Sequence, residues 1–435
     1  MTRLDTRDPG FAAQFDALVN ARRDTDADVA RDVAAIIRSV RDQGEAAIRA
    51  FTQKLDRHDL DQSGWRIEPA TCAAAFDALE PGLRAALELA ADRIRAYHER
   101  QLPQDSDFTD PVGVRLGARW RAVDAAGLYV PGGRAAYPSS LLMNAIPAKV
   151  AGVERIAMAT PTPNGEINPL VLAAAHLAGV DEIWRVGGAQ AIAAFAYGAG
   201  RIAPVDVVTG PGNAWVAEAK RQLYGVVGID MVAGPSEIVV VADAKNPADW
   251  VAADLLSQAE HDVTTQSILF TDDADFADKV AEAVDRQIPA LATAATARAA
   301  WDANGAIVVV ERLEDALPLV DRLAPEHLQL AVDHPQALFD RVRHAGSVFL
   351  GRHTPEAIGD YVAGPNHVLP TGRRARFASG LSVLDFMKRT SFLGLDETAL
   401  AELGPATVAL ANAEGLPAHA RSVALRLRLN REGAY

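Results

Sequence analysis

The sequence has a single cysteine in 435 residues, no long apolar run and no apolar segment at its start. One cysteine excludes both an internal disulfide and a zinc site built from cysteines. That residue, Cys72, lies in the alanine-rich stretch ATCAAAFDAL, where we expect a small buried apolar side chain. Because the chain has neither a membrane-spanning stretch nor a secretory signal, we expect a cytoplasmic protein that does not bind membranes.

Positive charge is also scarce. Lys and Arg number 43 against 57 Asp and Glu, which gives a formal charge of -14 at pH 7. A nucleic-acid partner is not expected, because surfaces that follow phosphates need clustered basic side chains. The hydrophobic content of 49 % is that of an ordinary globular protein, and the length is sufficient for two or more cores.

The order of the predicted elements indicates an α/β fold. Residues 1 to about 100 show long helical periods, such as ALELAADRIRAYHER. From about residue 120 the chain alternates short apolar runs, Pro/Gly loops and helical stretches, which is typical of mainly parallel sheets covered by helices. The strands are too many for one simple unit, so we expect two α/β lobes and a helix-rich tail.

Four loops rich in glycine or proline adjoin predicted strands, and α/β sheets bind ligands beyond the carboxyl ends of their strands. They are YVPGGR, VGGAQAI, TGPGNAW and AGPSE. In VTGPGNAWV the glycines allow the backbone to approach a phosphate, and the following helix offers free N–H groups. Neither this loop nor VGGAQAIAA has the GxGxxG spacing of the dinucleotide fingerprint, so a nucleotide role and plain turn chemistry both stay open.

The stretch DLLSQAEHD, residues 254–262, places an amide beside an imidazole. Asn246 and Pro247 are a suitable cap and first-turn pair for a helix that starts there and runs into this stretch. Gln258 and His261 then fall three residues apart on one helical face, at the point where that helix must end.

LAPEHLQL places Glu326 directly before His327. A carboxylate can activate water, and an imidazole can take a proton from an alcohol. The alternative is a helix that starts after Pro325, with Glu326 in its first turn facing the helix dipole. The local pattern favours this structural alternative.

Two further segments carry polar residues in loops rich in turn formers. Asp360 and His367 lie in TPEAIGDYVAGPNHVLPTG, and Glu414 and His419 lie in AEGLPAHARS. Candidate metal ligands are therefore Gln258, His261, Asp360 and His419. No local zinc motif such as HExxH contains them, so the residues alone predict an α/β enzyme with open possibilities of nucleotide and metal binding.

Taken together, these motifs resemble the histidinol dehydrogenase family. The matching stretches include GLYVPGGRAAYPSSLLMNAIPAKVAGV, VGGAQAIAAFAYG, VTGPGNAWVAEAKR, DMVAGPSEIVV, DLLSQAEHD, LAPEHLQL, GDYVAGPNHVLPTGRRARFASGLSVLDFMKR and EGLPAHARSVALR. They occur in the family's order over roughly residues 115 to 425. The resemblance implies an enzyme of histidine biosynthesis that oxidises L-histidinol to L-histidine through L-histidinal with two NAD.

The resemblance also implies the roles of site residues. Zinc would be held by Gln258, His261, Asp360 and His419. His327 would take the hydroxyl proton in each oxidation, and Glu326 would activate the water that hydrates the aldehyde. Substrate contacts would be Ser236, Gln258, His261, His327, Asp360, Glu414 and His419, and NAD contacts would be Tyr129, Gln190 and Asn213. From His367 we expect an active-site hydrogen bond.

The same resemblance implies two lobes like incomplete Rossmann folds in a homodimer with shared active sites. We divide the chain into a helical segment at 1–25, a first lobe of 26–128 with 237–381, a second lobe of 129–236, and a helical element at 382–435. Glu414 and His419, on the last element, would reach the active site of the partner.

Two other functions stay open. The chain also resembles a sister family, the sulfopropanediol dehydrogenases, which share the zinc and NAD sites but oxidise a small sulfonated diol. A zinc hydrolase, from a different class, could use Glu326 as its base and would need no nicotinamide. A scaffold protein would leave the combination of Glu326, His327 and the glycine-rich loops unexplained.

Overall fold

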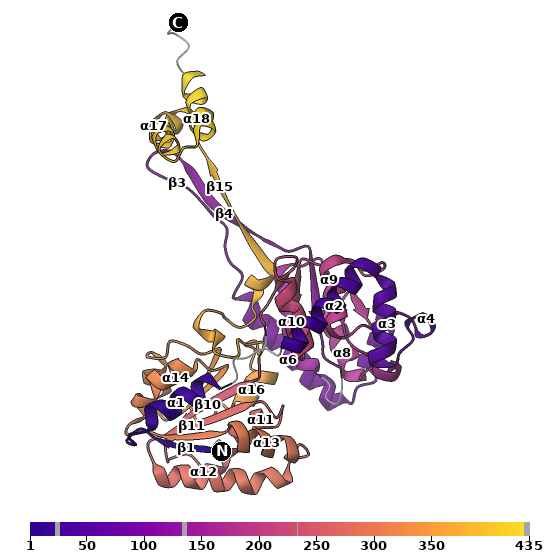
Figure 1. Ribbon diagram of the computed structural model, residues 1–435, viewed down its shortest axis with the longest axis vertical. Helices are drawn as coiled ribbons and strands as arrows, with labels where there is room; N and C mark the ends of the chain where they lie inside the picture. The colour runs from indigo at the N-terminus through magenta and orange to yellow at the C-terminus, as the bar shows by residue number, and fades with distance from the viewer. Residues whose placement is uncertain (22–26, 133–136, 233, 430–435) are drawn as a thin grey trace. The chain divides into compact units, whose positions relative to one another are not determined.

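The computed structural model describes residues 1–435 except 22–26, 133–136, 233 and 430–435 (Figure 1). The chain forms two units. Unit 1 comprises Met1–Gln101 and Val123–Phe386, and unit 2 comprises Leu102–Ala122 and Met387–Tyr435. Unit 1 contains two sheets, here called sheet A and sheet B, each covered by helices.

Sheet A is entirely parallel. Its strands, in spatial order, are β1 (Thr2–Asp5), β12 (Ala306–Val309), β11 (Gln266–Thr271), β10 (Glu237–Ala242), β13 (His327–Ala331) and β14 (Ser347–Leu350). From β10 the chain adds strands outward on one side and then, from β13, on the other. This order places a topological switch point between β10 and β13.

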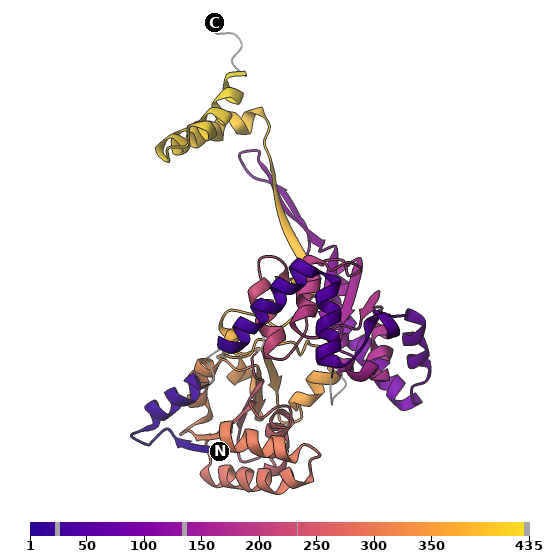
Figure 2. The ribbon, with the colours of Figure 1, turned by 45° about the vertical axis from the view of Figure 1, so that its right-hand side comes forward.

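Helices cover both faces of sheet A (Figures 1 and 2). One apolar cluster joins the sheet to α11 (Ala248–Ala259), α12 (Ala274–Gln287) and α13 (Ala294–Asn304). The other joins it to α1 (Phe11–Asn20), α14 (Leu317–Leu323) and α15 (Pro335–Phe339). Because both faces are buried, strands such as EIVVVA read as continuous apolar runs rather than alternating ones.

Sheet B repeats this plan with one antiparallel edge strand. Its order is β2 (Arg66–Ile67), β7 (Glu182–Trp184), β6 (Arg155–Ala159), β5 (Ala125–Tyr129), β8 (Val207–Thr209) and β9 (Gly228–Ile229), with β2 antiparallel to β7. The chain again moves outward from one strand, β5, in both directions. The switch point lies between β5 and β8.

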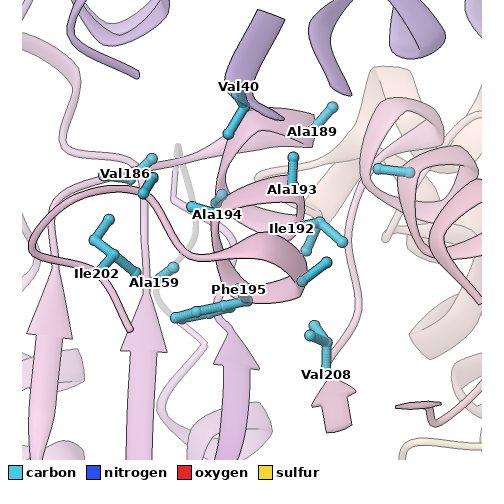
Figure 3. Packing of buried hydrophobic residues seen from close by; sticks show 14 of the residues in the cluster. Val40, Ala159, Val186, Ala189, Ile192, Ala193, Ala194, Phe195, Ile202 and Val208 are labelled. Atoms are coloured by element: carbon cyan, nitrogen blue, oxygen red, sulfur yellow. The ribbon is translucent and has the colours of Figure 1, made fainter. Parts of the chain in front are cut away.

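One face of sheet B packs against α2 (Ala27–Gln43), α3 (Glu45–Asp56), α4 (Leu60–Ser63), α9 (Gly188–Tyr197) and α10 (Ala214–Leu223). Figure 3 shows α9 between the strands and Val40 of α2, with Phe195 lying over the strands. Gly127 of β5 permits this close approach, since a Cβ there would lie 2.7 Å from the Phe195 ring. The remaining helices of this lobe are α5 (Pro69–Asp77), α6 (Pro81–Glu99), α7 (Pro138–Ala151), which packs on β5, and α8 (Pro169–Ala178).

Unit 2 is an antiparallel ribbon with two helices. β4 (Arg115–Ala122) pairs with both β3 (Ser106–Thr109) and β15 (Met387–Gly394), and α17 (Glu397–Ala413) packs against α18 (Pro417–Leu429). Unit 1 also contains α16 (Glu356–Tyr361) and short 3₁₀ turns at Pro163–Gly165, Ile288–Ala290, Leu313–Ala316, Arg374–Arg376 and Val383–Phe386.

The two parallel, helix-covered sheets confirm the predicted fold class, but the chain is divided differently from the prediction. The predicted segment 1–25 contains β1, which is an edge strand of sheet A. Of the predicted segment 26–128, which the prediction groups with 237–381, residues 27–101 and 123–128 contribute to sheet B and its helices, and residues 102–122 belong to unit 2. The predicted helical element at 382–435 begins with a strand, β15, whose partner β4 (115–122) the prediction places in another lobe. Each difference comes from a pairing between segments far apart in sequence.

Candidate active site

Glu326 and His327 lie side by side at the amino end of β13. The left-handed backbone of Ala324 (φ +47°) ends α14, and β13 begins at His327. The Glu326 carboxylate accepts a hydrogen bond from the N–H of Glu237 at 2.9 Å, and Nδ1 of His327 donates to the Glu237 carbonyl oxygen at 3.0 Å. The alternative in which Glu326 opens a helix is wrong, because residues 327–331 pair with β10 as a strand.

The two ring nitrogens of His327 have different surroundings. Because Nδ1 donates its proton to a carbonyl oxygen, Nε2 is the nitrogen left to exchange a proton. It is buried, and no described residue hydrogen bonds to it. Nε2 lies 3.7 Å from Oε1 of Glu356 and 3.7 Å from Oδ1 of Asp360. The ring is therefore held in one orientation with its reactive nitrogen facing acidic side chains.

Glu356 is the member of this cluster that the sequence analysis missed. It is buried, and its Oε2 accepts a hydrogen bond from the Ser257 hydroxyl at 2.7 Å. Its ligand atom lies within 4.8 Å of those of His327 and Asp360, a grouping that can hold a metal ion. The available signal was its spacing of four residues from Asp360, which places both on one face of α16.

Gln258 and His261 lie at the end of α11, as predicted, although Asn246 does not cap that helix. Its N-cap is Pro247, and the Asn246 amide instead donates to the carbonyl oxygen of Ala331. Nε2 of Gln258 lies 3.3 Å from Nδ1 of His261. The Gln258 amide oxygen is buried and has no hydrogen-bond partner in the described part of the chain.

These residues fit a bound cation. An unpaired buried amide oxygen is costly unless something accepts its lone pairs, and a metal ion does so. Packed atoms desolvate the His261 ring and lower its pKa, although the residue keeps an exposed surface, so the imidazole is in the neutral form that binds metals. Asp360 contributes negative charge to the same neighbourhood. Amide, imidazole and carboxylate donors of this kind suit zinc.

The carboxylates around His327 perturb one another. Burial lowers the pKa of His327, but the negative charge of Glu326, together with Asp360 and Glu356, outweighs it and raises that pKa to about 10. Burial raises the pKa of Glu326 to about 8 and that of Glu356 to about 7. Burial also acts on Asp360, but His327 holds its pKa below the ordinary value. Such displaced pKa values are typical of groups that exchange protons in a reaction.

His367 contacts the same cluster. Its Nδ1 donates to the backbone carbonyl oxygen of Asp360 at 2.9 Å, and its Nε2 lies 3.2 Å from the hydroxyl of Ser140 on α7. Burial lowers the pKa of His367. The ring thus links the Asp360 segment to the lobe of sheet B.

The position of the cluster differs from the general expectation for α/β sheets. Glu326 and His327 precede the core of β13, and Ser236 directly precedes β10, where its carbonyl oxygen accepts a hydrogen bond from Gln266 at 3.0 Å. These residues lie at the amino ends of the strands of sheet A, whereas the expected binding edge is the carboxyl end.

In sheet B the predicted NAD contacts do lie at the carboxyl ends of strands. Tyr129 ends β5, Gln190 is in the first turn of α9 after β7, and Asn213 follows β8. The Tyr129 hydroxyl accepts a hydrogen bond from the N–H of Gly188 at 3.0 Å. The Gln190 amide oxygen is buried without a partner among the described residues, and the Asn213 side chain caps α10 through the N–H of Val216.

Glu414 and His419 belong to unit 2. Glu414 ends α17, His419 is in the first turn of α18, and both are exposed. Unit 1 alone therefore brings together Gln258, His261, Glu326, His327 and Asp360, and the contribution of Glu414 and His419 stays a prediction. Cys72 is buried in α5, as predicted, and burial raises its thiol pKa.

Two helix-covered parallel sheets and a buried cluster of imidazole and carboxylate groups define an α/β enzyme. The comparisons with known proteins specify its family. The profile of the histidinol dehydrogenase family matches residues 19–427. The chain is 63 % identical over 427 residues to the histidinol dehydrogenase of Zymomonas mobilis, covering 98 % of this chain and 99 % of that protein. It is 59 % identical to that of Ruegeria pomeroyi over 98 % and 99 % of the two chains.

Among solved structures, the histidinol dehydrogenase of Elizabethkingia anophelis matches with a TM-score of 0.93 and 33 % identity, and the match covers 99 % of each chain. The chain therefore belongs to the histidinol dehydrogenase family, whose members are NAD-dependent oxidoreductases of histidine biosynthesis that also use zinc. The predicted family and cofactors are confirmed. In the described part of the chain, no helix is both long and apolar enough to cross a bilayer.

Proposed function

We propose that this protein oxidises L-histidinol to L-histidine through L-histidinal, with two NAD consumed in sequence, in the last steps of histidine biosynthesis. The observation that carries the proposal is the arrangement of His327, with Nδ1 fixed by a backbone carbonyl and Nε2 unpaired, beside the buried carboxylate of Glu326. An alcohol oxidation needs a base for the hydroxyl proton, and an aldehyde oxidation needs an activated nucleophile.

His327 serves as the base in both oxidations; a cation held by Asp360 would offset the negative charge that raises the pKa of its ring and so favour the neutral imidazole that accepts a proton. Its Nε2 takes the hydroxyl proton of the alcohol while hydride leaves for NAD, and it does the same for the hydrated aldehyde. The hydrogen bond from Nδ1 to the Glu237 carbonyl keeps the ring in the orientation that this transfer requires. Glu356 and Asp360, each 3.7 Å from Nε2, stabilise the imidazolium that forms.

Glu326 activates the water that attacks the aldehyde carbon. One carboxylate oxygen is bound to the Glu237 N–H, which leaves the other to take a proton from water. Burial raises the pKa of Glu326 to about 8, so the ionised fraction of this carboxylate is a stronger base than an exposed glutamate. A thiol is not available for the same step, because Cys72 is buried in α5, within the lobe of sheet B.

Zinc would be held by Gln258, His261, Asp360 and, from a second subunit, His419. When bound, it supplies a fixed positive centre that positions the imidazole and amine nitrogens of the substrate. Substrate would also contact Ser236, His327 and Glu414. NAD would contact Tyr129, Gln190 and Asn213, at the carboxyl edge of sheet B.

The active enzyme is a homodimer in the cytoplasm, in which Glu414 and His419 complete the site of the partner subunit. The exposure of both residues supports this, as do the uncovered leucines of unit 2: Leu393, Leu403, Leu410, Leu416 and Leu425. Several exposed leucines on so small a unit are typical of a surface that another subunit covers.

The first test is the NADH formed per L-histidinol consumed, measured with and without a zinc chelator. We expect two NADH per substrate, loss of activity with the chelator and recovery on addition of zinc. One NADH per substrate would contradict the four-electron reaction. Turnover of a sulfonated diol without turnover of histidinol would move the chain to the sulfopropanediol type, and hydrolysis without NADH would favour the zinc hydrolase.

A second test concerns the shared site. Glu326→Gln and His419→Ala homodimers are each expected to be nearly inactive. Subunits mixed and exchanged between the two should regain about a quarter of the wild-type activity, because half of the dimers are mixed and one of their two sites is intact. Unchanged inactivity in a mixture shown by mass spectrometry to contain mixed dimers would mean that each site is built from one chain.

A further inference from the structure

A lysine and an aspartate form a buried ion pair beside the loop 210–213. Lys220 lies on α10 and is 1 % exposed, and Asp230 follows β9 with a side chain that is also 1 % exposed. Burying a charged pair in a protein interior carries a desolvation penalty that often cancels its attraction, so stability alone is a weak reason for it. The contacts of the pair indicate a more specific role.

Both partners bind the backbone of Gly210. The Lys220 ammonium contacts the Asp230 carboxylate and donates to the carbonyl oxygen of Gly210 at 3.0 Å. The other oxygen of Asp230 accepts a hydrogen bond from the N–H of Gly210 at 2.8 Å. The backbone donor and the backbone acceptor of one residue are thus fixed by one charged pair, and charge-assisted hydrogen bonds are the stronger kind.

Gly210 itself is confined by a second contact. Its backbone has φ +112°, and a Cβ at this position would lie 2.2 Å from the carbonyl oxygen of Tyr129. Tyr129 in turn accepts the N–H of Gly188 on its hydroxyl. Gly210 in the loop after β8 therefore lies against Tyr129 at the end of β5, and Tyr129 in turn bonds to the start of α9; each of these three segments carries one of the expected NAD contacts.

We propose that Lys220 and Asp230 are positioning residues for NAD: they hold the loop 210–213 in the conformation that binds the dinucleotide. This inference rests on the proposed function, which places NAD at Tyr129, Gln190 and Asn213. α10 does not need the pair for packing, because Val216, Ala219 and Leu223 already bury its apolar face. A loop ordered in advance binds its ligand without the cost of ordering it.

The test compares Lys220→Met with Leu223→Ala. The first removes the ammonium and keeps an unbranched side chain, and the second removes buried apolar volume from the same helix without contacting Gly210. Steady-state kinetics give kcat and the KM values for NAD and histidinol, titration with NADH followed by fluorescence gives its Kd, and thermal unfolding gives Tm. We expect Lys220→Met to raise the KM for NAD and the Kd for NADH about 10-fold or more, with kcat at saturating NAD and the KM for histidinol changed less than about twofold.

Leu223→Ala is expected to lower Tm and to leave the KM for NAD near that of wild type. If both variants raise the KM for NAD by the same factor, loss of stability explains the effect and the proposal is overturned. An unchanged KM for NAD in Lys220→Met overturns it as well. Should Lys220→Met not fold because Asp230 is left charged, the neutral double variant Lys220→Met/Asp230→Asn provides the same comparison. Absence of NADH formation by the wild type would instead refute the proposed function.

Discussion

The variant His327→Gln is expected to lose about 10²- to 10⁴-fold in the rate of both oxidation steps, which is the usual contribution of a positioned proton-transfer group. Both steps remove a hydroxyl proton as hydride departs, and Nε2 of His327 is the ring nitrogen left for that proton. A glutamine amide can donate to the Glu237 carbonyl in place of Nδ1, but it cannot accept a proton at neutral pH. The fold is therefore expected to be kept while the base is lost.

Single-turnover measurements of NADH, started separately from histidinol and from histidinal, give the two rates. The matched control is His58→Gln, since His58 is also buried and lies in the loop between α3 and α4, among the helices of sheet B. The control should keep both rates within about twofold of wild type. If the two rates in His327→Gln resemble those of the control, His327 is not the base. If only one of the two rates falls, the two steps use different bases.

Much of the fold could be predicted because its signals are local. Alternation of apolar runs and helical periods indicated two parallel, helix-covered sheets, and the glycine-rich loops after β7 and β8 did follow strands of one sheet. The division of the chain could not be predicted in the same way. β1 pairs with β12 although about 300 residues separate them, and α2 contributes to the core of sheet B. Periodicity reports which face of an element is buried but not which distant element covers it.

The candidate site shows the same limit. The adjacency of Glu326 and His327 is visible in the sequence, but whether this segment starts a helix or a strand depends on its pairing with β10, which local residues do not encode. The spacing of Glu356 from Asp360 indicates a shared helical face, but its place beside His327 depends on how α16 packs against β13. In sheet B the loops expected to contact NAD follow the carboxyl ends of strands, as the rule for α/β sheets predicts, whereas Glu326 and His327 lie at the opposite, amino edge of sheet A.

The second large effect is expected from Glu326→Gln, which should slow the conversion of histidinal to histidine by about 10²- to 10³-fold and affect the oxidation of histidinol much less. Hydration of the aldehyde is needed only in the second half of the reaction, so only that half requires the Glu326 carboxylate as a base. Glutamine has the same shape and its amide oxygen can still accept the Glu237 N–H, so the hydrogen bond that fixes residue 326 is retained.

The measurement is the NADH formed from histidinol in a single turnover, followed in time. Wild type should give two NADH in close succession, and Glu326→Gln should give one NADH rapidly and the second slowly, with histidinal accumulating between them. The matched control is Glu356→Gln, which also removes a buried carboxylate near His327 but leaves Glu326 in place. Because Glu356 acts through the proton that His327 takes in both steps, its variant should slow the two steps by similar factors. If Glu326→Gln slowed both steps by the same factor, Glu326 would, like Glu356, stabilise the protonated form of His327. Another group would then have to activate the water.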